Sequence, residues 1–424
     1  MTQSDPRSFI PYARQSISAS DIDAVVYALQ SPMITRGANV EAFEQAIAQY
    51  CGAQFAVALN SGSTALIAAC HAAQTTVNDC VISTPNTFVA SVNAATRYGA
   101  KPVLIDIDRS TGNLDLNRLE EVLKSDKRSR GKNVIIPVHF AGLPVDMQRL
   151  ESLIRSPDTV VIEDAAHALG SKYADGQMVG CCAWSDMTIF SFHPVKTITT
   201  GEGGMVLTNN PDLYHRLKRF RNNGIERNPD LFEAEVEERF EGYYEVKEAT
   251  NNYNFTEFQA ALGLSQLERI DQFIQKRRQL IAKYRELLKG VSNLQMLTDT
   301  MDDRTAFHLC VVQIDFAAYN TTRSQLVQDL GECGVGTQVH YIPVYRHPFF
   351  KERYGDIREC FVETEKYYSQ ALSLPLYYEL EMSDVEFVVE TLKKSLAESA
   401  KRKPLPSKDT HKHHHHKHLR QRHS

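Results

Sequence analysis

The sequence SFHPVKTITTGEGG, residues 191–204, lies between two apolar runs, MTIFSF (187–192) and GMVLTN (204–209). Apolar runs of this length are typical of buried strands, so the segment between them is expected to turn at the edge of a sheet. Lys196 stands just beyond the first strand, within a turn rich in Gly, Ser and Thr. A lysine in a dry pocket has a lowered pKa, and its free amine can form an imine and act as a base. We therefore predict that Lys196 is catalytic.

Five further short apolar runs precede this segment in the chain. They are FAVAL (55–59), VIST (81–84), VLIDID (103–108), VIIPVH (134–139) and TVVIED (159–164). Helix-length segments separate them, and runs that are apolar throughout indicate strands covered on both faces. The pattern predicts an α/β fold with a mostly parallel seven-stranded sheet. No G-x-G-x-x-G follows any of these strands, which argues against a dinucleotide-binding domain.

The pattern changes after residue 255. Residues 256–290 predict one long, kinked amphipathic helix, and HLCVVQIDF (308–316) with later helices predicts a smaller α+β domain. The last residues are basic, rich in His and almost without apolar side chains, so they are expected to be disordered. We predict a large domain over 1–255, a linking helix and small C-terminal domain over 256–400, and a disordered tail over 401–424.

Composition excludes several classes of protein. The chain is 42% hydrophobic with a net charge of −5, and its positive charge gathers in the tail, so the body does not suggest nucleic-acid binding. No apolar run is long enough to span a membrane. Eight cysteines without a C-x-x-C pair are expected to be reduced thiols, and no metal site is predicted. The first residues, MTQSDPRSFI, lack the layout of a signal peptide, so we predict a cytoplasmic protein.

Two polar motifs follow predicted strands, at the sheet edge where parallel α/β folds bind ligands. Residues 60–64, Asn-Ser-Gly-Ser-Thr, open a helix, and its N–H groups suit a phosphate, although Ser and Gly are also ordinary capping residues. Glu163-Asp164-Ala165-Ala166-His167 ends the run TVVIED. A carboxylate at the mouth of an apolar strand needs a cation, such as the protonated ring nitrogen of pyridoxal phosphate. A capping Asp164 beside a core His167 explains the second motif equally well.

Together the motifs resemble one family. GSTAL (62–66), TFVAS (87–91), EDAAHALG (163–170), SFHPVKTITTGEGG (191–204) and NYNFTEFQAALGLSQL (252–267) match in order and spacing. The chain resembles the DegT-type nucleotide-sugar aminotransferases from about residue 12 to about residue 398. The resemblance implies the aspartate-aminotransferase-like fold (fold type I), pyridoxal 5'-phosphate as cofactor, and a homodimer with active sites at its interface.

The resemblance also implies roles for single residues. Lys196 would hold the cofactor as a Schiff base and move a proton to and from the substrate carbon, while Asp164 would pair with the pyridine nitrogen. Further cofactor contacts would come from Gly62, Ser63, Thr64, Phe88, His167, Ser191 and, from the partner subunit, Asn252. The family usually reads G-Y-N-x-R around that Asn, whereas this chain reads Thr250-Asn251-Asn252-Tyr253-Asn254, so Asn251 is an alternative.

Within the family, the stretches SFHPVK, LGLSQL and VHYIPVYRHPFF are most similar to enzymes of pseudaminic acid synthesis. These enzymes use glutamate to aminate C4 of a UDP-linked 4-keto-6-deoxy-N-acetylhexosamine. By this likeness, substrate contacts are expected from Tyr12, Pro32, Met33, Ile34, Thr35, His340 and Tyr341. For Tyr341 and its aromatic neighbours, simple packing explains the sequence nearly as well.

Other functions stay open. The chain could aminate another nucleotide-linked ketosugar, such as a 4-keto-arabinose or a dTDP-linked sugar, because small changes in a sugar alter binding only modestly. A sugar dehydratase of the same family would carry His at the Schiff-base position, so Lys196 argues against it. A non-catalytic regulatory or scaffold protein on this fold would not need Lys196, Asp164 and His167 together.

Overall fold

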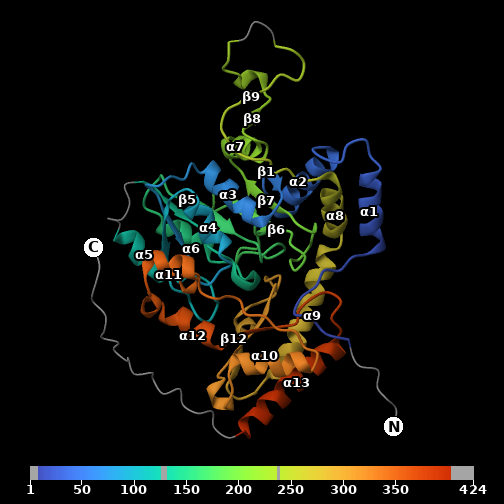
Figure 1. Cartoon of the computed structure of the whole chain (residues 1–424), viewed down its shortest axis with the longest axis vertical. Coiled ribbons are helices and arrows are strands. Elements are labelled where there is room, and N and C mark those ends of the chain that lie inside the picture. Colours follow the sequence, from blue (N-terminus) through green and yellow to red (C-terminus); the bar gives the residue numbers. More distant parts are fainter. Residues whose placement is uncertain (1–7, 126–130, 236–238, 403–424) are drawn as a thin grey trace, which may run out of the picture.

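The computed structural model describes residues 8–125, 131–235 and 239–402. The predicted tail, apart from Lys401 and Arg402, therefore lies outside the described residues. Figure 1 shows a central sheet with helices on both sides, a smaller unit below it, and an arm that projects above it. The arm carries a short antiparallel pair, β8 (Ile225–Glu226) and β9 (Glu245–Val246).

The central sheet has seven strands, as the sequence predicts, in the order β1-β7-β6-β5-β4-β2-β3. The strands are β1 (Phe55–Leu59), β2 (Cys80–Ser83), β3 (Lys101–Leu104), β4 (Asn133–Ile135), β5 (Val160–Asp164), β6 (Met187–Ser191) and β7 (Gly204–Thr208). β7 alone runs antiparallel to its neighbours, so the sheet is mostly parallel. β4 is shorter than the predicted run 134–139 because Pro137 has no N–H to donate to a strand ladder.

Two hydrophobic cores cover the two faces of this sheet. Successive residues of a strand point to opposite faces, so Val57 and Leu59 of β1 join one core while Ala56 and Ala58 join the other. The first core is closed by α3 (Gly62–Ala72), α4 (Ala90–Thr96) and α7 (Pro211–Arg221), and the second by α2 (Ala38–Cys51), α5 (Leu116–Lys124) and α6 (Met147–Leu153). Strands buried on both sides explain the continuous apolar runs of the sequence.

Residues 256–290 form two helices and not one. α8 (Glu257–Leu267) and α9 (Ile270–Leu288) are separated by Glu268 and Arg269. At this break the guanidinium of Arg269 donates to the buried carboxylate of Asp21 at 2.6 Å. Asp21 also accepts from Ser265 and Gln266, which holds α1 (Ala19–Leu29) against α8. The start of α9 packs into the large core and its later part into the small one.

The smaller unit is an antiparallel sheet with helices. Its strands, in the order β10-β11-β12, are β10 (Leu294–Met296), β11 (Cys310–Ile314) and β12 (Ala371–Leu374). Its helices are α10 (Arg323–Glu332), α12 (Val362–Gln370) and α13 (Met382–Ala400), whereas Phe350 of α11 (Pro348–Tyr354) packs against Val92 of α4 in the large unit. Among the described residues, no helix is long and apolar enough to cross a membrane.

α8 lies very close to α2 because it carries a glycine at the contact. A Cβ atom on Gly263 would lie 2.5 Å from Cζ of the buried Phe43, whereas a Cβ on Gly331 of α10 would meet nothing within 4 Å. Gly263→Ala should therefore overpack the core and destabilise the protein by about 1–3 kcal/mol. Gly331→Ala, the matched control, should stabilise α10 by about 0.5–1 kcal/mol, since alanine is the better helix former. Urea unfolding midpoints test both; equal midpoints for the two variants would contradict this packing.

Candidate active site

A cavity of about 890 Å³ lies at the carboxyl ends of β1, β5 and β6. This is where open α/β sheets bind ligands, and the volume is that of an ordinary small-molecule site. The predicted site residues that line it are Tyr12, Gly62, Ser63, Thr64, Phe88, Asp164, His167, Ser191, Lys196, His340 and Tyr341. The fold thus brings together side chains that are more than 300 residues apart in the sequence.

Lys196 stands in the turn between β6 and β7. Its N–H donates to the carbonyl of His193 at 2.9 Å, and the carbonyl of Phe192 accepts from Thr200 N–H at 3.0 Å and Thr199 Oγ1 at 2.9 Å. These bonds fix the turn. Burial lowers the pKa of the Lys196 amine to about 8, against the opposing charge of Asp164. A substantial fraction of the amine is therefore free to react near neutral pH.

Asp164 is the last residue of β5, and its carboxylate faces the cavity. It accepts from Ser91 Oγ at 2.5 Å and from Ala166 N–H at 3.2 Å. Among the described residues no lysine, arginine or histidine lies within ion-pair distance of it. A buried carboxylate without an ionic partner suits a cationic group of a bound ligand.

Glu163 points to the opposite face of β5 and is fully enclosed. Its carboxylate accepts from His139 Nε2 at 2.6 Å, Ser185 Oγ at 2.5 Å, Thr188 Oγ1 at 3.1 Å and the hydroxyl of Tyr173. Burial alone would raise the pKa of Glu163, but the hydrogen bonds from His139, Ser185 and Tyr173 hold it below its ordinary value. His139 Nδ1 accepts from the N–H of Val145 at 3.0 Å, so its proton lies on Nε2. Glu163 is thus a buried anion with every oxygen satisfied.

The N-terminus of α3 borders the cavity. The Ser61 side chain caps the helix by accepting from Thr64 N–H at 3.1 Å, while the amides of Gly62 and Ser63 have no acceptor within the described part of the chain. A Cβ on Gly62 would lie 2.8 Å from Cβ of Ser191, so only glycine permits this approach. Ser61 therefore caps the helix, and the amides of Gly62 and Ser63 stay available for the phosphate that the sequence predicts.

His167 connects the two parts of the cavity wall. Its Nδ1 accepts from Ala141 N–H at 3.2 Å, so Nε2 carries the proton and donates to the Tyr341 hydroxyl at 2.8 Å. Burial lowers the pKa of His167 well below its ordinary value, and the charge of Lys196 lowers it further. Burial likewise lowers the pKa of His308 and brings that of His340 to about 3. The imidazoles of His167, His308 and His340 are therefore neutral.

These residues fit the predicted pyridoxal phosphate. The free amides at the α3 N-terminus and the close approach of Gly62 to Ser191 offer an anion cradle. The buried Asp164 offers a counter-charge for a protonated ring nitrogen, and Lys196 offers the amine that binds an aldehyde. A phosphate, a pyridinium and an aldehyde are the functional groups that this donor set accommodates.

Five predicted residues lie outside the cavity within one chain. Residues 32–35 (Pro32, Met33, Ile34 and Thr35) are exposed beside the start of α8, where Thr35 bridges to Thr256. Asn252 is also exposed, and its Oδ1 accepts from the side chain of Asn254 at 2.7 Å. Their assigned contacts with substrate and cofactor stay predictions.

Several residues of the cavity wall or its support were not predicted from the sequence, and three of them have polar groups that bear on the site. Asn60 lines the cavity with a buried Oδ1 that has no partner among the described residues, and His308 lines it with a similar Nδ1. Ser91 lies behind the wall and orients Asp164. Asn60 and Ser91 could have been found, since both belong to quoted motifs at strand or helix ends. His308 begins the apolar run 308–316, and no pattern around it indicates a functional residue.

The fold and this cavity define a transferase of the Schiff-base-forming, fold type I class. Residues 15–393 match the DegT/DnrJ/EryC1/StrS aminotransferase family, and the chain belongs to this family. It is 36% identical to the UDP-4-amino-4,6-dideoxy-N-acetyl-beta-L-altrosamine transaminase of Campylobacter jejuni, over 90% of this chain and 96% of that protein.

Solved structures are similar as well. Helicobacter pylori PseC, an aminotransferase involved in the biosynthesis of pseudaminic acid, has 27% identity and a TM-score of 0.82, over 92% of this chain and all of that one. Spr1654 of Streptococcus pneumoniae, described as a sugar aminotransferase and solved in its PMP form, has the same identity, coverage and TM-score.

The lowered pKa of Lys196 gives a direct prediction. The cofactor-free protein should capture pyridoxal phosphate about tenfold faster per pH unit below the pKa of about 8, and at a constant rate above it, because only the neutral amine reacts. In Asp164→Asn the charge that raises this pKa is gone, so the plateau should begin at lower pH. Stopped-flow absorbance measures the rate, and borohydride trapping with peptide mapping identifies the lysine. A midpoint near the ordinary value of 10.5, or label on another lysine, would contradict the assignment.

Proposed function

We propose that this protein is a pyridoxal-phosphate-dependent transaminase that moves an amino group from glutamate to C4 of a UDP-linked 4-keto-6-deoxy-N-acetylhexosamine, as in pseudaminic acid biosynthesis. The observation that carries the proposal is one cavity lined by the Lys196 amine, the Asp164 carboxylate and the N-terminus of α3. Similarity to the C. jejuni transaminase and to PseC supports this sugar among the family's ketosugar substrates. The second candidate is transfer to another nucleotide-linked ketosugar.

The residues that line the cavity have different roles in the proposed reaction. Pyridoxal phosphate, when bound, supplies an electron sink and carries the amino group between the two substrates. Nζ of Lys196, neutral above a pH of about 8, accepts a proton from the substrate carbon and returns it. The Asp164 carboxylate keeps a proton on the ring nitrogen by its charge. The amides at the start of α3 and the Ser191 hydroxyl hold the phosphate.

Aromatic and imidazole side chains form the substrate side of the cavity. Tyr12 and His340 lie with ring centroids 5.6 Å apart, and Phe88 and Tyr341 6.4 Å apart. Phe88 is largely exposed at the cavity wall, so one face of its ring is free to stack on the cofactor. Tyr12, His340 and Tyr341 offer polar atoms to a sugar. A neutral imidazole can donate or accept a hydrogen bond without adding a positive charge beside Lys196.

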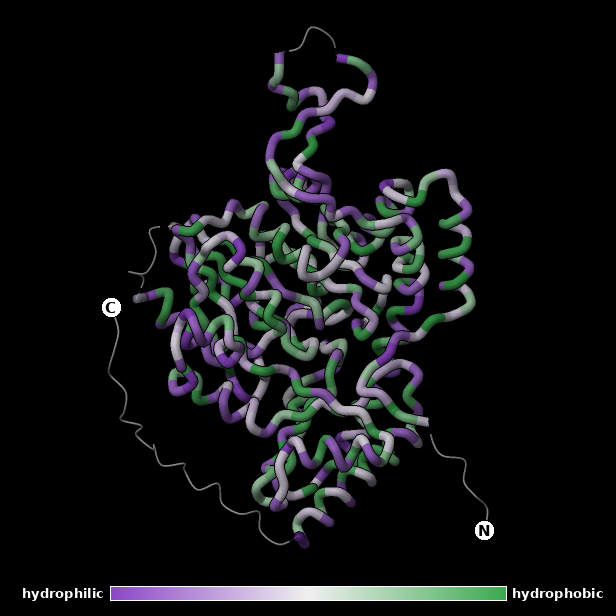
Figure 2. Tube along the Cα trace, in the orientation of Figure 1, coloured by the Kyte–Doolittle hydropathy of each residue, from purple (hydrophilic) through white to green (hydrophobic). Residues whose placement is uncertain are grey.

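We also propose a homodimer with two chains at each site. Ile22, Val26 and Leu29 share one face of α1 at the edge of the molecule, and all three are exposed. Figure 2 shows hydrophobic segments along this helix. A second copy that covers the face would bury this apolar surface. Asn252 and residues 32–35, exposed in one chain, would then meet the cavity of the partner.

A cytoplasmic location agrees with the cysteines. All eight are free, and six of them are buried. Free thiols persist where the compartment is reducing.

The substrate is tested by an amino-transfer assay with glutamate as donor and a panel of nucleotide ketosugars. We expect kcat/KM for the UDP-linked 4-keto-6-deoxy-N-acetylhexosamine to exceed that for UDP-4-keto-arabinose or a dTDP-linked ketosugar by about tenfold or more. NMR of the product should locate the new amine at C4. A higher value for another sugar would favour the second candidate, and an absent cofactor absorbance band with no turnover would point to a non-catalytic protein.

The dimer is tested by complementation between inactive chains. If Lys196 and Asn252 come from different chains, a heterodimer of Lys196→Ala and Asn252→Ala has one intact site and one with both lesions. Random co-refolding makes about half of the dimers mixed, so activity should recover to about a quarter of wild type. Lys196→Ala mixed with Asp164→Asn is the matched control and should stay inactive, because every mixed site keeps one lesion. No recovery in verified heterodimers would remove Asn252 from the partner's site.

A further inference from the structure

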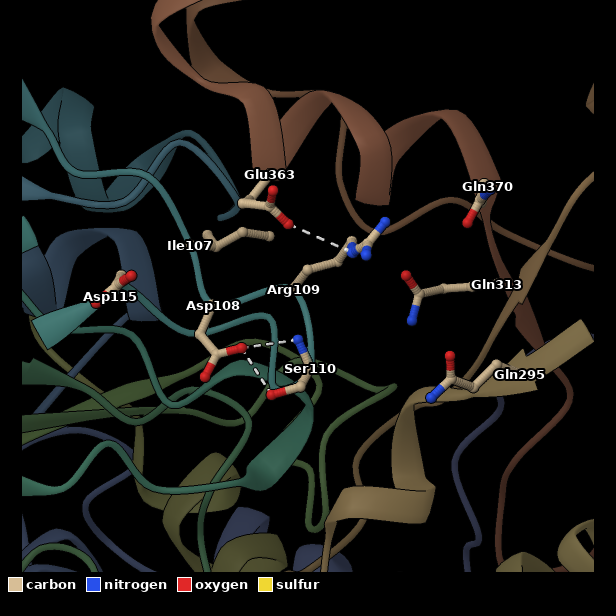
Figure 3. A pocket seen from close by; sticks show the side chains of 9 residues that line it. All are labelled: Ile107, Asp108, Arg109, Ser110, Asp115, Gln295, Gln313, Glu363 and Gln370. Atoms are coloured by element: carbon tan, nitrogen blue, oxygen red, sulfur yellow. Dashed lines mark hydrogen bonds and ion pairs between the residues drawn. The ribbon is translucent and has the colours of Figure 1, made fainter. Parts of the chain in front are cut away.

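A second cavity, of about 480 Å³, shares no lining residue with the Lys196 cavity. One side is the segment 107–115 that follows β3, and the other is formed by the small sheet and α12. Figure 3 shows the side chains that line it. Its volume falls within the usual range of small-molecule sites, about 300–1,000 Å³.

Three glutamines line one side of this cavity. Gln295 of β10 and Gln313 of β11 are paired across the small sheet, and Gln370 directly precedes Ala371, the β12 partner of Gln313. Neighbouring strand positions place their carboxamides together. In Figure 3 the three amides surround the same opening, and the guanidinium of Arg109 reaches toward them from the opposite side.

Gln313 is the anomaly that points to a ligand. It is the single polar residue of the strand CVVQI and is only 8% exposed. Its amide points into the cavity, yet no hydrogen bond of this side chain is made to any other described residue. A glutamine has two donors and two acceptors, and buried polar groups are as a rule hydrogen-bonded. The amide of Gln313 is therefore available to a group that enters the cavity.

The surrounding charges define the chemistry of that ligand. Arg109 Nε lies 3.4 Å from the carboxylate of Glu363, and Asp108 and Asp115 line the same cavity. Three carboxylates around one guanidinium disfavour a phosphate or another multivalent anion. Carboxamides, by contrast, donate and accept at once, as hydroxyl groups do.

We propose that this cavity binds a small, uncharged, polyhydroxylated ligand, that is, a saccharide unit. Gln313, Gln295 and Gln370 exchange hydrogen bonds with its hydroxyls from the small sheet, and Arg109 donates from the segment after β3. The ligand would contact both parts of the molecule. The site is separate from the Lys196 cavity, and the proposal does not depend on which ketosugar is aminated.

The test uses the full chain with its cofactor and N-acetyl-D-glucosamine as probe, titrated by saturation-transfer difference NMR. Gln313→Leu and Arg109→Ala should each weaken binding by about fivefold to tenfold, the effect of lost hydrogen bonds. Arg109 is partly exposed, so its variant remains informative if Gln313→Leu folds poorly. Gln328→Leu on the exposed face of α10 is the matched control and should leave binding unchanged.

Three outcomes would overturn the proposal. The first is no saturation transfer to the sugar. The second is binding that His340→Ala weakens and that Gln313→Leu and Arg109→Ala leave unchanged, which would assign the sugar to the Lys196 cavity. The third is displacement of the sugar by inorganic phosphate in wild type but not in Arg109→Ala, which would make the cavity an anion site.

Discussion

The active site depends on a buried anion that does no chemistry. Glu163 is enclosed at the end of β5 and accepts four hydrogen bonds. The donors are His139 after β4, Tyr173 and Ser185 in the segment between β5 and β6, and Thr188 in β6. A buried carboxylate is tolerable only with such a full set of donors. Because successive strand residues point to opposite faces, fixing Glu163 beneath the sheet fixes Asp164 in the cavity above it.

Burial also makes the amine of Lys196 reactive. Loss of water alone lowers the pKa of its amine to about 8. Burial also keeps His167, His308 and His340 neutral. Neutral imidazoles can still hold hydrogen bonds, as His167 does with Tyr341. The cavity therefore places the carboxylate of Asp164 near an amine whose pKa is lowered to about 8.

How far the sequence predicts this arrangement follows from the range of each interaction. Apolar runs predict the seven strands because each strand is buried on both faces, which leaves a mark in its own sequence. Motifs at the strand ends predict that Lys196 and Asp164 line the site. The short bond from Ser91 to Asp164 joins residues 73 positions apart, so the motif that contains Ser91 does not indicate which residue it contacts. The helix break at Arg269 depends likewise on distant Asp21. The proposed roles of Asn252 and residues 32–35 would require a second chain, and they rest on the family resemblance because both segments are exposed in one chain.

Gly204 explains how the proposed phosphate cradle can form at all. β1 and β6 are not neighbours, because antiparallel β7 lies between them and begins at the cavity edge with Gly204. A Cβ on Gly204 would lie 2.2 Å from the carbonyl oxygen of Ser61. Without that atom, the turn after β1 crosses the start of β7 and brings Gly62 against Ser191 at the end of β6. Glycine here supplies space and not flexibility. The antiparallel strand, which looks like an irregularity of the sheet, is thus the element whose start, without a side chain, lets the ends of two non-adjacent strands meet at the proposed phosphate site.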